Sequence, residues 1–425
     1  MFDRRSKNVR IFKDTVDLIE NSQRLQEAIS NSLSRQQLYL EADEVAIPES
    51  LEKVCQTVVS TKRSFEAASA YARAGKKVCV LNFASATNPG GGVTNGSSAQ
   101  EECLCRCSTL YLCLDEDEMW QKFYLPHRKT ADPLYNDDCI YTPGVIVAKS
   151  DISFPERMPE ADWYQVDVLT CAAPNLRDMP SNMMNPFAGD KPADIEDDDL
   201  YKLHVQRIEK IFRIAAANGA EVLILGAFGC GAFCNPPEVV AKAFYDVHKK
   251  YENYFETIEY AVFCGGHETQ NYDAFCKQFG VEKVYDLSRF HEAHAKDYQK
   301  ALKEVKAGYK RSHWMWYIFP QIVGLGHSRT SVFYAISDIG EAKAYMQDPV
   351  LGAHMKELCE ALLSLETNDA VEVFDWPDDM KLKSSMTLFE KAVPEECIFG
   401  KVLDKFFAGE RDQATIMLIK WCSEL

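Results

Sequence analysis

Two short apolar runs, each followed by a glycine-containing loop and then by a helical pattern, constrain the fold of this chain most strongly. The runs span residues 78–83 and 222–226, and uninterrupted apolar runs of this length are typical of buried strands in a parallel sheet. Further strands are predicted at 144–149, 164–171 and 258–264. Helices are predicted at 64–74, 99–114, 200–218, from Pro236 or Pro237, and at 272–279. Strands that alternate with helices indicate an α/β domain with a mostly parallel sheet.

The pattern changes after about residue 286. The remaining residues contain almost no β-branched runs and show helical periodicity at 291–307, 340–347, 349–365, 381–393 and 412–422. The first 75 residues are polar and lean helical, with a helical stretch at 22–40. We therefore expect an α/β domain with a helical N-terminal extension over residues 1–286, followed by an all-α domain over residues 287–425.

Composition narrows the possible partners and location. The net charge of −17 argues against general nucleic-acid binding, which needs a basic face to displace counterions from phosphates. No apolar run of 18 residues and no secretory signal are found, so we expect no membrane association and a cytoplasmic protein. The 15 cysteines are too sparse for a disulfide scaffold and are expected to be reduced.

A cysteine cluster at Cys103, Cys105 and Cys107 has the spacing C-x-C-x-C. Zinc sites usually use C-x2-C or longer spacings with a second pair nearby, so small buried residues are the better interpretation. We predict no metal and no cofactor.

The loop after the first apolar run holds the residues best suited to chemistry. It reads Asn82-Phe-Ala-Ser-Ala-Thr-Asn88-Pro-Gly90-Gly91-Gly92, then seven residues, then Gln100-Glu101-Glu102. Consecutive glycines let the backbone approach a ligand closely and cradle a diphosphate, and the amides of Asn82 and Asn88 can bind sugar hydroxyls. Of two adjacent carboxylates, one can hold ribose hydroxyls as an anion while the other donates a proton.

A second loop, Gly226-Ala-Phe-Gly229-Cys230-Gly231-Ala-Phe233, also follows a predicted strand and precedes a helix. Ligands of α/β sheets bind at the carboxyl ends of strands, where a helix N-terminus attracts phosphate. Phe228 or Phe233 can pack on a ribose or adenine ring. A single glycine-rich turn, or a Glu-Glu pair at a helix start, is more often structural. Two such loops in one sheet, one followed by two carboxylates, favour a binding site.

The triple glycine, the seven-residue spacer and Gln100-Glu101-Glu102 resemble the signature of the poly(ADP-ribose) glycohydrolases. The segments 82–86 and 229–233 resemble the microbial type in particular, and the resemblance covers roughly residues 10–285. It implies a macrodomain-like three-layer α/β/α sandwich that binds ADP-ribose or poly(ADP-ribose), expected to be attached to protein. The cysteines at 105 and 107 depart mildly from the family pattern.

The resemblance also implies roles for individual residues. Glu102 would be the catalytic acid and Glu101 the ligand of the ribose next to the scissile bond. Gly90, Gly91 and Gly92 would form the catalytic loop, whereas Gly229, Cys230 and Gly231 would wrap the diphosphate and Phe233 would orient the terminal ribose. The implied reaction is hydrolysis of the ribose–ribose O-glycosidic bond through an oxocarbenium-like transition state.

Three alternatives stay open at this level. The chain could hydrolyse mono-ADP-ribose from protein or nucleic acid, it could be a non-catalytic reader of ADP-ribose, or it could be a phosphatase acting on an ADP-ribose phosphoester. A reader needs no acid at Glu102, and the placement of the glutamates fits the phosphatase less well.

The C-terminal region contains the aromatic segment His313-Trp-Met-Trp-Tyr-Ile-Phe-Pro-Gln321. Together with Ser328 and residues 383–386 it resembles the domain-of-unknown-function family DUF1810. That resemblance implies an all-α fold and no reaction. The segment is either a hydrophobic element that holds a small bundle together or the lining of a pocket, with a nucleotide as the ligand to test.

Overall fold

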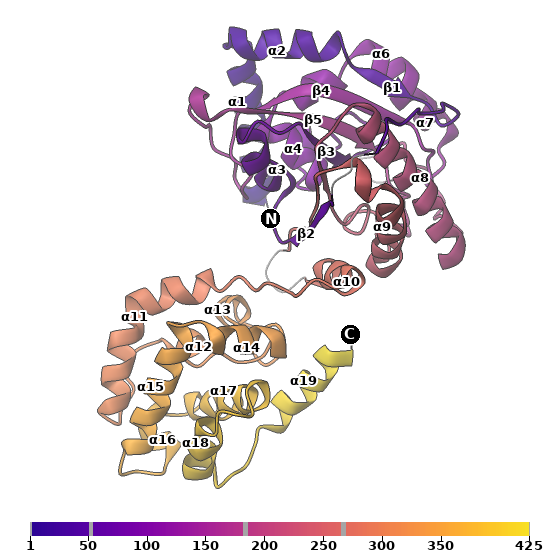
Figure 1. Ribbon diagram of the computed structural model, residues 1–425. Helices are drawn as coiled ribbons and strands as arrows, with labels where there is room; N and C mark the ends of the chain where they lie inside the picture. Colours follow the sequence, from indigo (N-terminus) through magenta and orange to yellow (C-terminus); the bar gives the residue numbers. More distant parts are fainter. Residues whose placement is uncertain (1, 51–53, 182–185, 265–268, 425) are drawn as a thin grey trace. The chain divides into compact units, whose positions relative to one another are not determined.

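The computed structural model describes residues 2–50, 54–181, 186–264 and 269–424. The chain divides into two compact units, Met1–Glu282 and Lys283–Leu425 (Figure 1). The first unit is built around one mixed sheet and the second consists of helices. The predicted fold class, an α/β region followed by an all-α region, is therefore confirmed. None of the described helices is both long enough and apolar enough to cross a bilayer.

The sheet of the first unit contains seven described strands. From one edge to the other they are β1 (Gln37–Tyr39), β4 (Cys139–Val147), β5 (Tyr164–Cys171), β3 (Val78–Phe83), β6 (Val222–Leu225), β7 (Thr257–Ala261) and β2 (Gln56–Ser60). The pairs β5–β3, β3–β6, β6–β7 and β7–β2 are parallel, whereas β1–β4 and β4–β5 are antiparallel. The carboxyl ends of β5, β3 and β6 therefore meet at one edge of the sheet.

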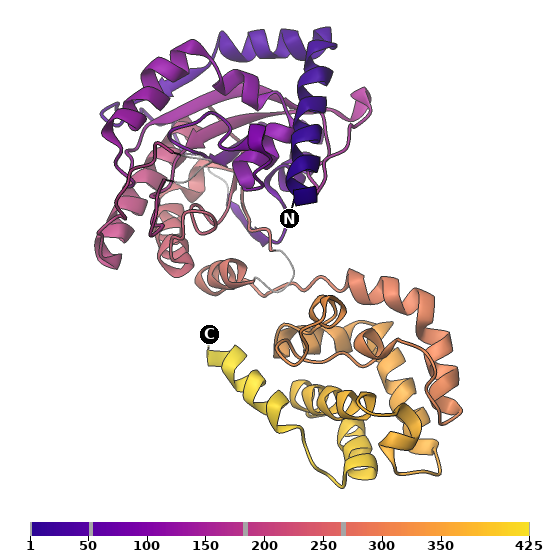
Figure 2. The ribbon, with the colours of Figure 1, turned by 180° about the vertical axis from the view of Figure 1, so that it is seen from behind.

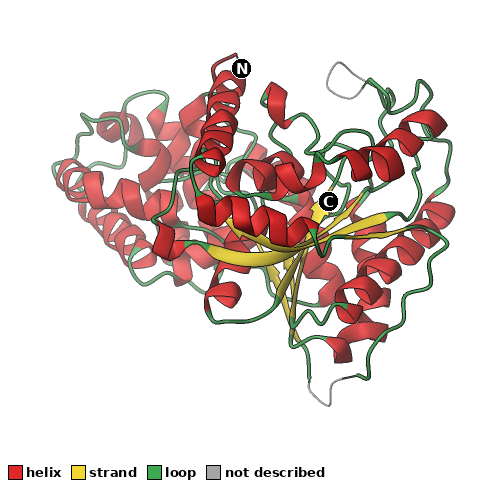
Figure 3. Cartoon of the chain, turned by 90° about the horizontal axis from the view of Figure 1, so that it is seen from above, coloured by secondary structure: helices red, strands yellow, loops and turns green. Residues whose placement is uncertain are grey.

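Side chains alternate along the central strands between two hydrophobic cores. Cys79 and Leu81 of β3 pack with helices α8 (Asp197–Ala217) and α9 (Pro237–Tyr251), whereas Val78 and Val80 pack on the opposite face. A strand that is apolar on both faces must be covered on both faces. Figure 3 shows the strands with helices on either side, which gives the three layers.

The other helices of this unit complete the two outer layers. α10 (Gln270–Phe279) packs on the α8 and α9 side, and α3 (Ser64–Arg73), α4 (Gln100–Cys107) and α5 (Leu110–Leu114) contribute to the opposite core. The remaining α-helices are α1 (Phe2–Glu20), α2 (Gln23–Leu33), α6 (Asp117–Met119) and α7 (Leu125–Thr130).

Several predicted boundaries are wrong for identifiable reasons. The helix expected at 22–40 ends at Leu33, because residues 37–39 pair with β4 as the edge strand β1. The helix expected at 99–114 is broken at Ser108, whose extended backbone bridges to Val147. The strand expected at 144–149 begins at Cys139, and strand β2 was not predicted.

The second unit is a helical bundle around one core. Its helices are α11 (Ser288–Lys306), α12 (Met315–Ile318), α13 (Arg329–Phe333), α14 (Ile339–Gln347), α15 (Leu351–Ser364), α16 (Ala370–Phe374), α17 (Asp378–Ala392), α18 (Ile398–Phe407) and α19 (Gln413–Glu424). The short helices and α18 were not predicted. Within the aromatic segment, Trp314, Met315, Ile318 and Phe319 are buried in this core, so the structure favours the hydrophobic interpretation for those four side chains.

Candidate active site

A cavity of about 1030 Å³ lies at the carboxyl ends of the parallel strands. It is lined by the loop between β3 and α4, by the first turn of α4, and by the loop between β6 and α9. This is the position at which open α/β sheets bind ligands. The two loops lie on neighbouring strands because β3 pairs directly with β6.

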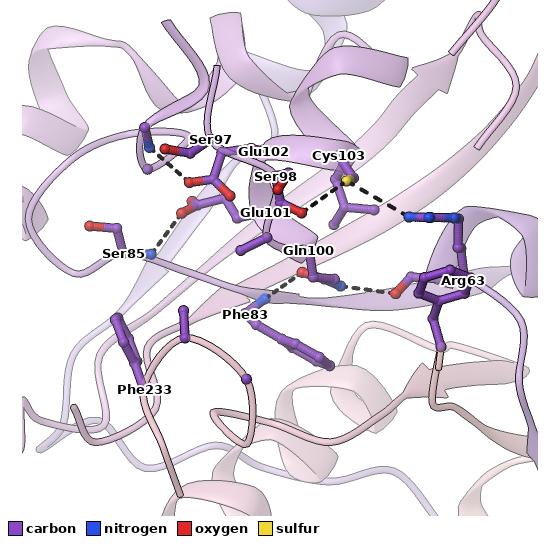
Figure 4. A pocket seen from close by; sticks show the side chains of 18 of the residues that line it. Arg63, Phe83, Ser85, Ser97, Ser98, Gln100, Glu101, Glu102, Cys103 and Phe233 are labelled. Carbon is purple, nitrogen blue, oxygen red and sulfur yellow. Dashed lines mark hydrogen bonds between the residues drawn. The ribbon is translucent and has the colours of Figure 1, made fainter. Parts of the chain in front are cut away.

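Glu102 stands in the first turn of α4 and is only 7% exposed. Its Oε1 accepts a 2.9 Å hydrogen bond from the backbone N–H of Gly92. Its Oε2 is buried and has no hydrogen-bond partner among the residues that the structure describes. Buried polar atoms are almost always paired, so this oxygen is a natural contact for a ligand in the cavity that Glu102 lines (Figure 4).

Glu101 is held quite differently. Its Oε2 accepts a 2.7 Å bond from the N–H of Ser85, and its Oε1 accepts a 3.3 Å bond from the side-chain amide of Asn82. The N–H of Gly90 also faces this carboxyl group. A carboxyl group that receives several N–H donors is stabilised in its ionised form.

Electrostatics act on the two carboxyls together. Burial raises the pKa of Glu101 well above its ordinary value, and the charge of Glu102 raises it further, whereas the bonds from Ser85 and Asn82 lower it. Burial also raises the pKa of Glu102, whereas the Gly92 hydrogen bond, the charge of Arg106 and the backbone of Glu102 and Ala99 lower it. Adjacent buried carboxyls disfavour double ionisation, so the pair retains a proton more readily than either would alone.

Glycine is required where the first loop passes over these carboxyls. Gly91 has φ +58°, and a Cβ added there would lie 2.6 Å from Oε1 of Glu102 and 3.0 Å from Oε2 of Glu101. Any side chain at this position would therefore collide with the two carboxyl groups. The triple glycine brings the backbone against the glutamates, as a ligand-covering loop requires.

Asn82 and Gln100, two predicted substrate-binding residues, support the glutamates. Asn82 is fully buried beneath Glu101, where its amide bridges Glu101 and the hydroxyl of Thr170, and it does not line the cavity. Gln100 lines the cavity, but its side chain bonds the N–H of Phe83, the carbonyl of Leu81 and the hydroxyl of Ser64. These bonds fix the start of α4 against the end of β3.

The second loop contributes Gly229, Gly231 and Phe233 to the cavity wall. Asn235 organises it: its amide donates to the carbonyls of Pro174 at 2.7 Å and of Gly229 at 3.1 Å. His204 contacts the amide oxygen of Asn235 through Nε2 at 2.8 Å, and burial lowers the pKa of His204 to about 4, so the imidazole is neutral and donates this bond.

Most of the predicted site residues come together around this cavity. Those that line it are Asn88, Gly91, Gly92, Gln100, Glu101, Glu102, Gly229, Gly231 and Phe233. Asn82, Gly90 and Cys230 do not. Cys105 and Cys107 are fully buried on α4, and the described residues contain no cluster of His, Cys, Asp or Glu able to hold a metal ion.

Sequence reasoning missed the cavity residues that come from distant segments. Arg4, Arg5 and Asn8 reach it from α1, and Arg63 and Phe263 stack against each other at 3.7 Å. Arg128 donates to the side-chain oxygen of Asn88. The arginines and Asn8 lie away from the glycine-rich loops, so no local pattern marks them, whereas Phe263 shortly precedes the glycine pair at 265–266.

Comparison with known proteins agrees with this geometry. Residues 9–150 match the family model described as microbial-type PARG, catalytic domain, and residues 284–419 match the model described as a protein of unknown function (DUF1810). Both resemblances predicted from the sequence are thereby confirmed. None of the curated proteins compared with the chain matches it.

Solved structures similar to the chain are bacterial poly(ADP-ribose) glycohydrolases. The enzyme from Thermomonospora curvata is 27% identical, with 66% of this chain and 100% of that chain covered and a TM-score of 0.55. The same enzyme bound to the inhibitor ADP-HPD is 28% identical with a TM-score of 0.53 over the same shares. The enzyme from Deinococcus radiodurans in complex with ADP-ribose is 26% identical, with 59% and 96% covered and a TM-score of 0.50.

Proposed function

We propose that the α/β unit hydrolyses the ribose–ribose O-glycosidic bond of poly(ADP-ribose), releasing ADP-ribose, with Glu102 as the general acid. One observation carries the proposal: Glu102 is buried with one oxygen fixed by the N–H of Gly92 and the other left without a partner. A proton on Oε2 therefore has no acceptor among the described residues and is available to a ligand in the cavity. The similarity to glycohydrolases crystallised with ADP-ribose and with an inhibitor supports this substrate class.

The proton belongs on Glu102 because the two carboxyls have different partners. Burial raises the pKa of both carboxyls. We nevertheless place the proton on Glu102, because both oxygens of Glu101 accept N–H donors, which favour its ionised form. Glu101 then binds hydroxyls of the ribose next to the scissile bond. Glu102 protonates the leaving ribose oxygen as the C–O bond breaks, and the ring passes through an oxocarbenium-like state. The resulting Glu102 carboxylate then accepts a proton from the water that attacks the anomeric carbon.

The second loop holds the remainder of the ADP-ribose unit in this proposal. Gly229, Cys230 and Gly231 follow β6 and precede α9, whose positive end favours phosphate. Phe233, which lines the cavity, orients the terminal ribose. Asn88, with its amide oxygen bound to Arg128, stands on the opposite loop.

A Glu102→Gln variant tests the acid. Gln keeps the shape and cannot donate that proton, so turnover of purified poly(ADP-ribose) should fall about 10²–10⁴-fold, the usual contribution of a general acid. ADP-ribose affinity, measured by calorimetry, should survive. Glu259→Gln is the matched control because Glu259 is fully buried in the same unit and does not line the cavity.

Two outcomes contradict the proposal. An active Glu102→Gln protein removes Glu102 from the role of acid, and a wild-type protein that binds ADP-ribose without cleaving any ADP-ribosyl bond is a reader. Parallel assays on mono-ADP-ribosylated protein separate polymer cleavage from removal of a single unit.

We further propose that the chain has two functional domains, a glycohydrolase over residues 1–286 and an all-α domain over residues 287–425. The division into compact units between Glu282 and Lys283 supports a boundary in this region. Limited proteolysis of the full chain should cut first near the boundary and release two stable fragments. First cuts inside β3 or α15 would contradict it.

A further inference from the structure

The cavity wall contains arginines that pair with no acidic group in the described segments. Arg4, Arg5 and Arg177 line the cavity, and none of them makes a side-chain hydrogen bond, ion pair or ring contact in the part of the chain that the structure describes. Arg63, by contrast, stacks on Phe263 and contacts Cys103. In a chain of net charge −17, unpaired cations gathered in one cavity indicate an anionic ligand.

Arg4 and Arg5 are tied structurally to the catalytic loop. They lie in the first turns of α1, which contacts α4 and the loop before it (Figure 2). The amide of Asn8 donates to the carbonyl of Gly96 at 3.0 Å, and a Cβ on Gly96 would lie 2.4 Å from the carbonyl oxygen of Arg5. Arg5 therefore stands directly against the loop residue Gly96.

The loop that contains Gly96 is also hydrogen-bonded toward Glu102. The N–H of Ser97 donates to the carbonyl of Gly92 at 3.1 Å, and the N–H of Gly92 holds Glu102. In Figure 4, Ser97 and Ser98 lie beside Glu102, whereas Phe233 lies beyond Ser85 and Glu101. The start of α1 is thus next to the Ser97 side of the acid.

Arg177 belongs to the opposite side. It follows Leu176, whose N–H donates to the carbonyl of Phe233 at 2.9 Å. The unpaired cations therefore fall into two groups, one beside the second loop and one at the start of α1, and both groups line the cavity that Glu102 also lines.

We infer that Arg4 and Arg5 bind the diphosphate of the second ADP-ribose unit, the one that leaves with the polymer. The inference rests on the proposed function, in which the terminal unit occupies the second loop and its diphosphate lies on the Arg177 side. In that placement, the part of the polymer attached to the scissile oxygen extends past Glu102 toward α1. Guanidinium groups suit phosphate oxygens because they donate in a planar fork. A single ADP-ribose on an uncharged acceptor offers no phosphate there, so the pair selects polymer.

The test compares two substrates in an Arg4→Ala/Arg5→Ala variant of the full chain. One substrate is poly(ADP-ribose) and the other is ADP-ribose linked at the same anomeric carbon to a neutral aryl leaving group. We expect kcat/KM on the polymer to fall about tenfold or more and to lose much of its salt dependence, with less than about a twofold change on the aryl substrate. Arg4→Lys/Arg5→Lys should recover part of the loss through charge alone.

Arg10→Ala is the matched control, because Arg10 is exposed on the same helix and does not line the cavity. Equal losses on both substrates would overturn the inference and make α1 a structural support of the catalytic loop, and so would an unchanged polymer rate. Wild-type protein that cleaves neither substrate would instead overturn the proposed function itself.

Discussion

Glycine makes room for different groups in the two glycine-rich loops of the cavity. In the first loop, Gly91 leaves room for side chains that the protein itself supplies, since a Cβ there would meet the carboxyls of Glu101 and Glu102. In the second loop, Gly229 leaves room for the loop's own scaffold, because a Cβ would lie 2.6 Å from both Ala173 and the amide of Asn235. Gly231 has open space around it. The glycines of the first loop therefore allow the acid to be placed under the backbone. Those of the second loop shape the backbone and leave space for a ligand.

Of the substitutions that compare the two loops, Gly91→Ala is expected to have the largest effect, which is a loss of kcat. The added methyl must displace the carboxyl of Glu102, and kcat on poly(ADP-ribose) should fall at least about a hundredfold, the lower range for losing a general acid. The left-handed backbone adds a stability loss of about 1–2 kcal/mol. Stopped assays of ADP-ribose release together with thermal melts measure both quantities.

Gly280→Ala is the control that separates the cost of the left-handed backbone from the displacement of the Glu102 carboxyl. Gly280 has φ +63° against +58° for Gly91, and a Cβ there would meet none of the described residues beyond its chain neighbours within 4 Å. The Gly280→Ala variant should lose about as much stability as Gly91→Ala and keep the wild-type kcat. If Gly91→Ala keeps wild-type kcat, or if Gly280→Ala loses as much, the first loop is only a turn and the contrast with the second loop disappears.

A smaller effect, on affinity, is expected in the second loop. Gly229→Ala should push aside Asn235, which holds the carbonyls of Pro174 and Gly229. We expect ADP-ribose affinity to weaken about tenfold, which corresponds to about 1.4 kcal/mol, with a lower melting temperature. Calorimetric titration and thermal denaturation of the same samples measure the two effects.

Gly231→Ala is the partner experiment within the same loop. Apart from its chain neighbours, no described residue lies within 4 Å of the added methyl, so the melting temperature should stay at the wild-type value and any change should appear in ADP-ribose affinity alone. A melting temperature lowered as far as in Gly229→Ala would show that both glycines serve the scaffold.

Site residues could be predicted from the sequence where the interacting residues lie close together along the chain. The glutamates and the triple glycine lie within 13 residues of one another, so one strand-to-helix segment contains the whole acid motif. Arg5 and Asn8 reach Gly96 from 88 or more residues away, and nothing near them in the sequence marks that contact. Fold class could be predicted because the central strands are apolar on both faces.

Roles that depend on which way a side chain points were harder to predict. Asn82 was expected to bind sugar, yet its position on β3 turns it beneath Glu101, where it supports the carboxylate. Helix periodicity likewise could not reveal that Ser108 breaks the helix after α4, because that break depends on a bridge to Val147 on β4. Both features arise from the sheet, which is a tertiary arrangement.

The smallest effect concerns stability, and it sharpens the contrast between a loop that holds charge and one that does not. Burial raises the pKa of Glu101 and Glu102 from an ordinary value of 4.5, so the folded protein binds protons more tightly than the unfolded chain. Stability from these groups is fully present below pH 4.5 and decreases as pH rises toward the raised pKa values. Glu102→Gln mimics the protonated state and should melt about 2–4 °C above wild type at pH 8, the shift that about 1 kcal/mol produces in a large domain. The difference should shrink as the pH approaches 4.5, and Gly231→Ala should show no such trend. A Glu102→Gln protein less stable than wild type at pH 8 would mean that the charge on Glu102 is satisfied in the folded state, which contradicts an oxygen without a partner.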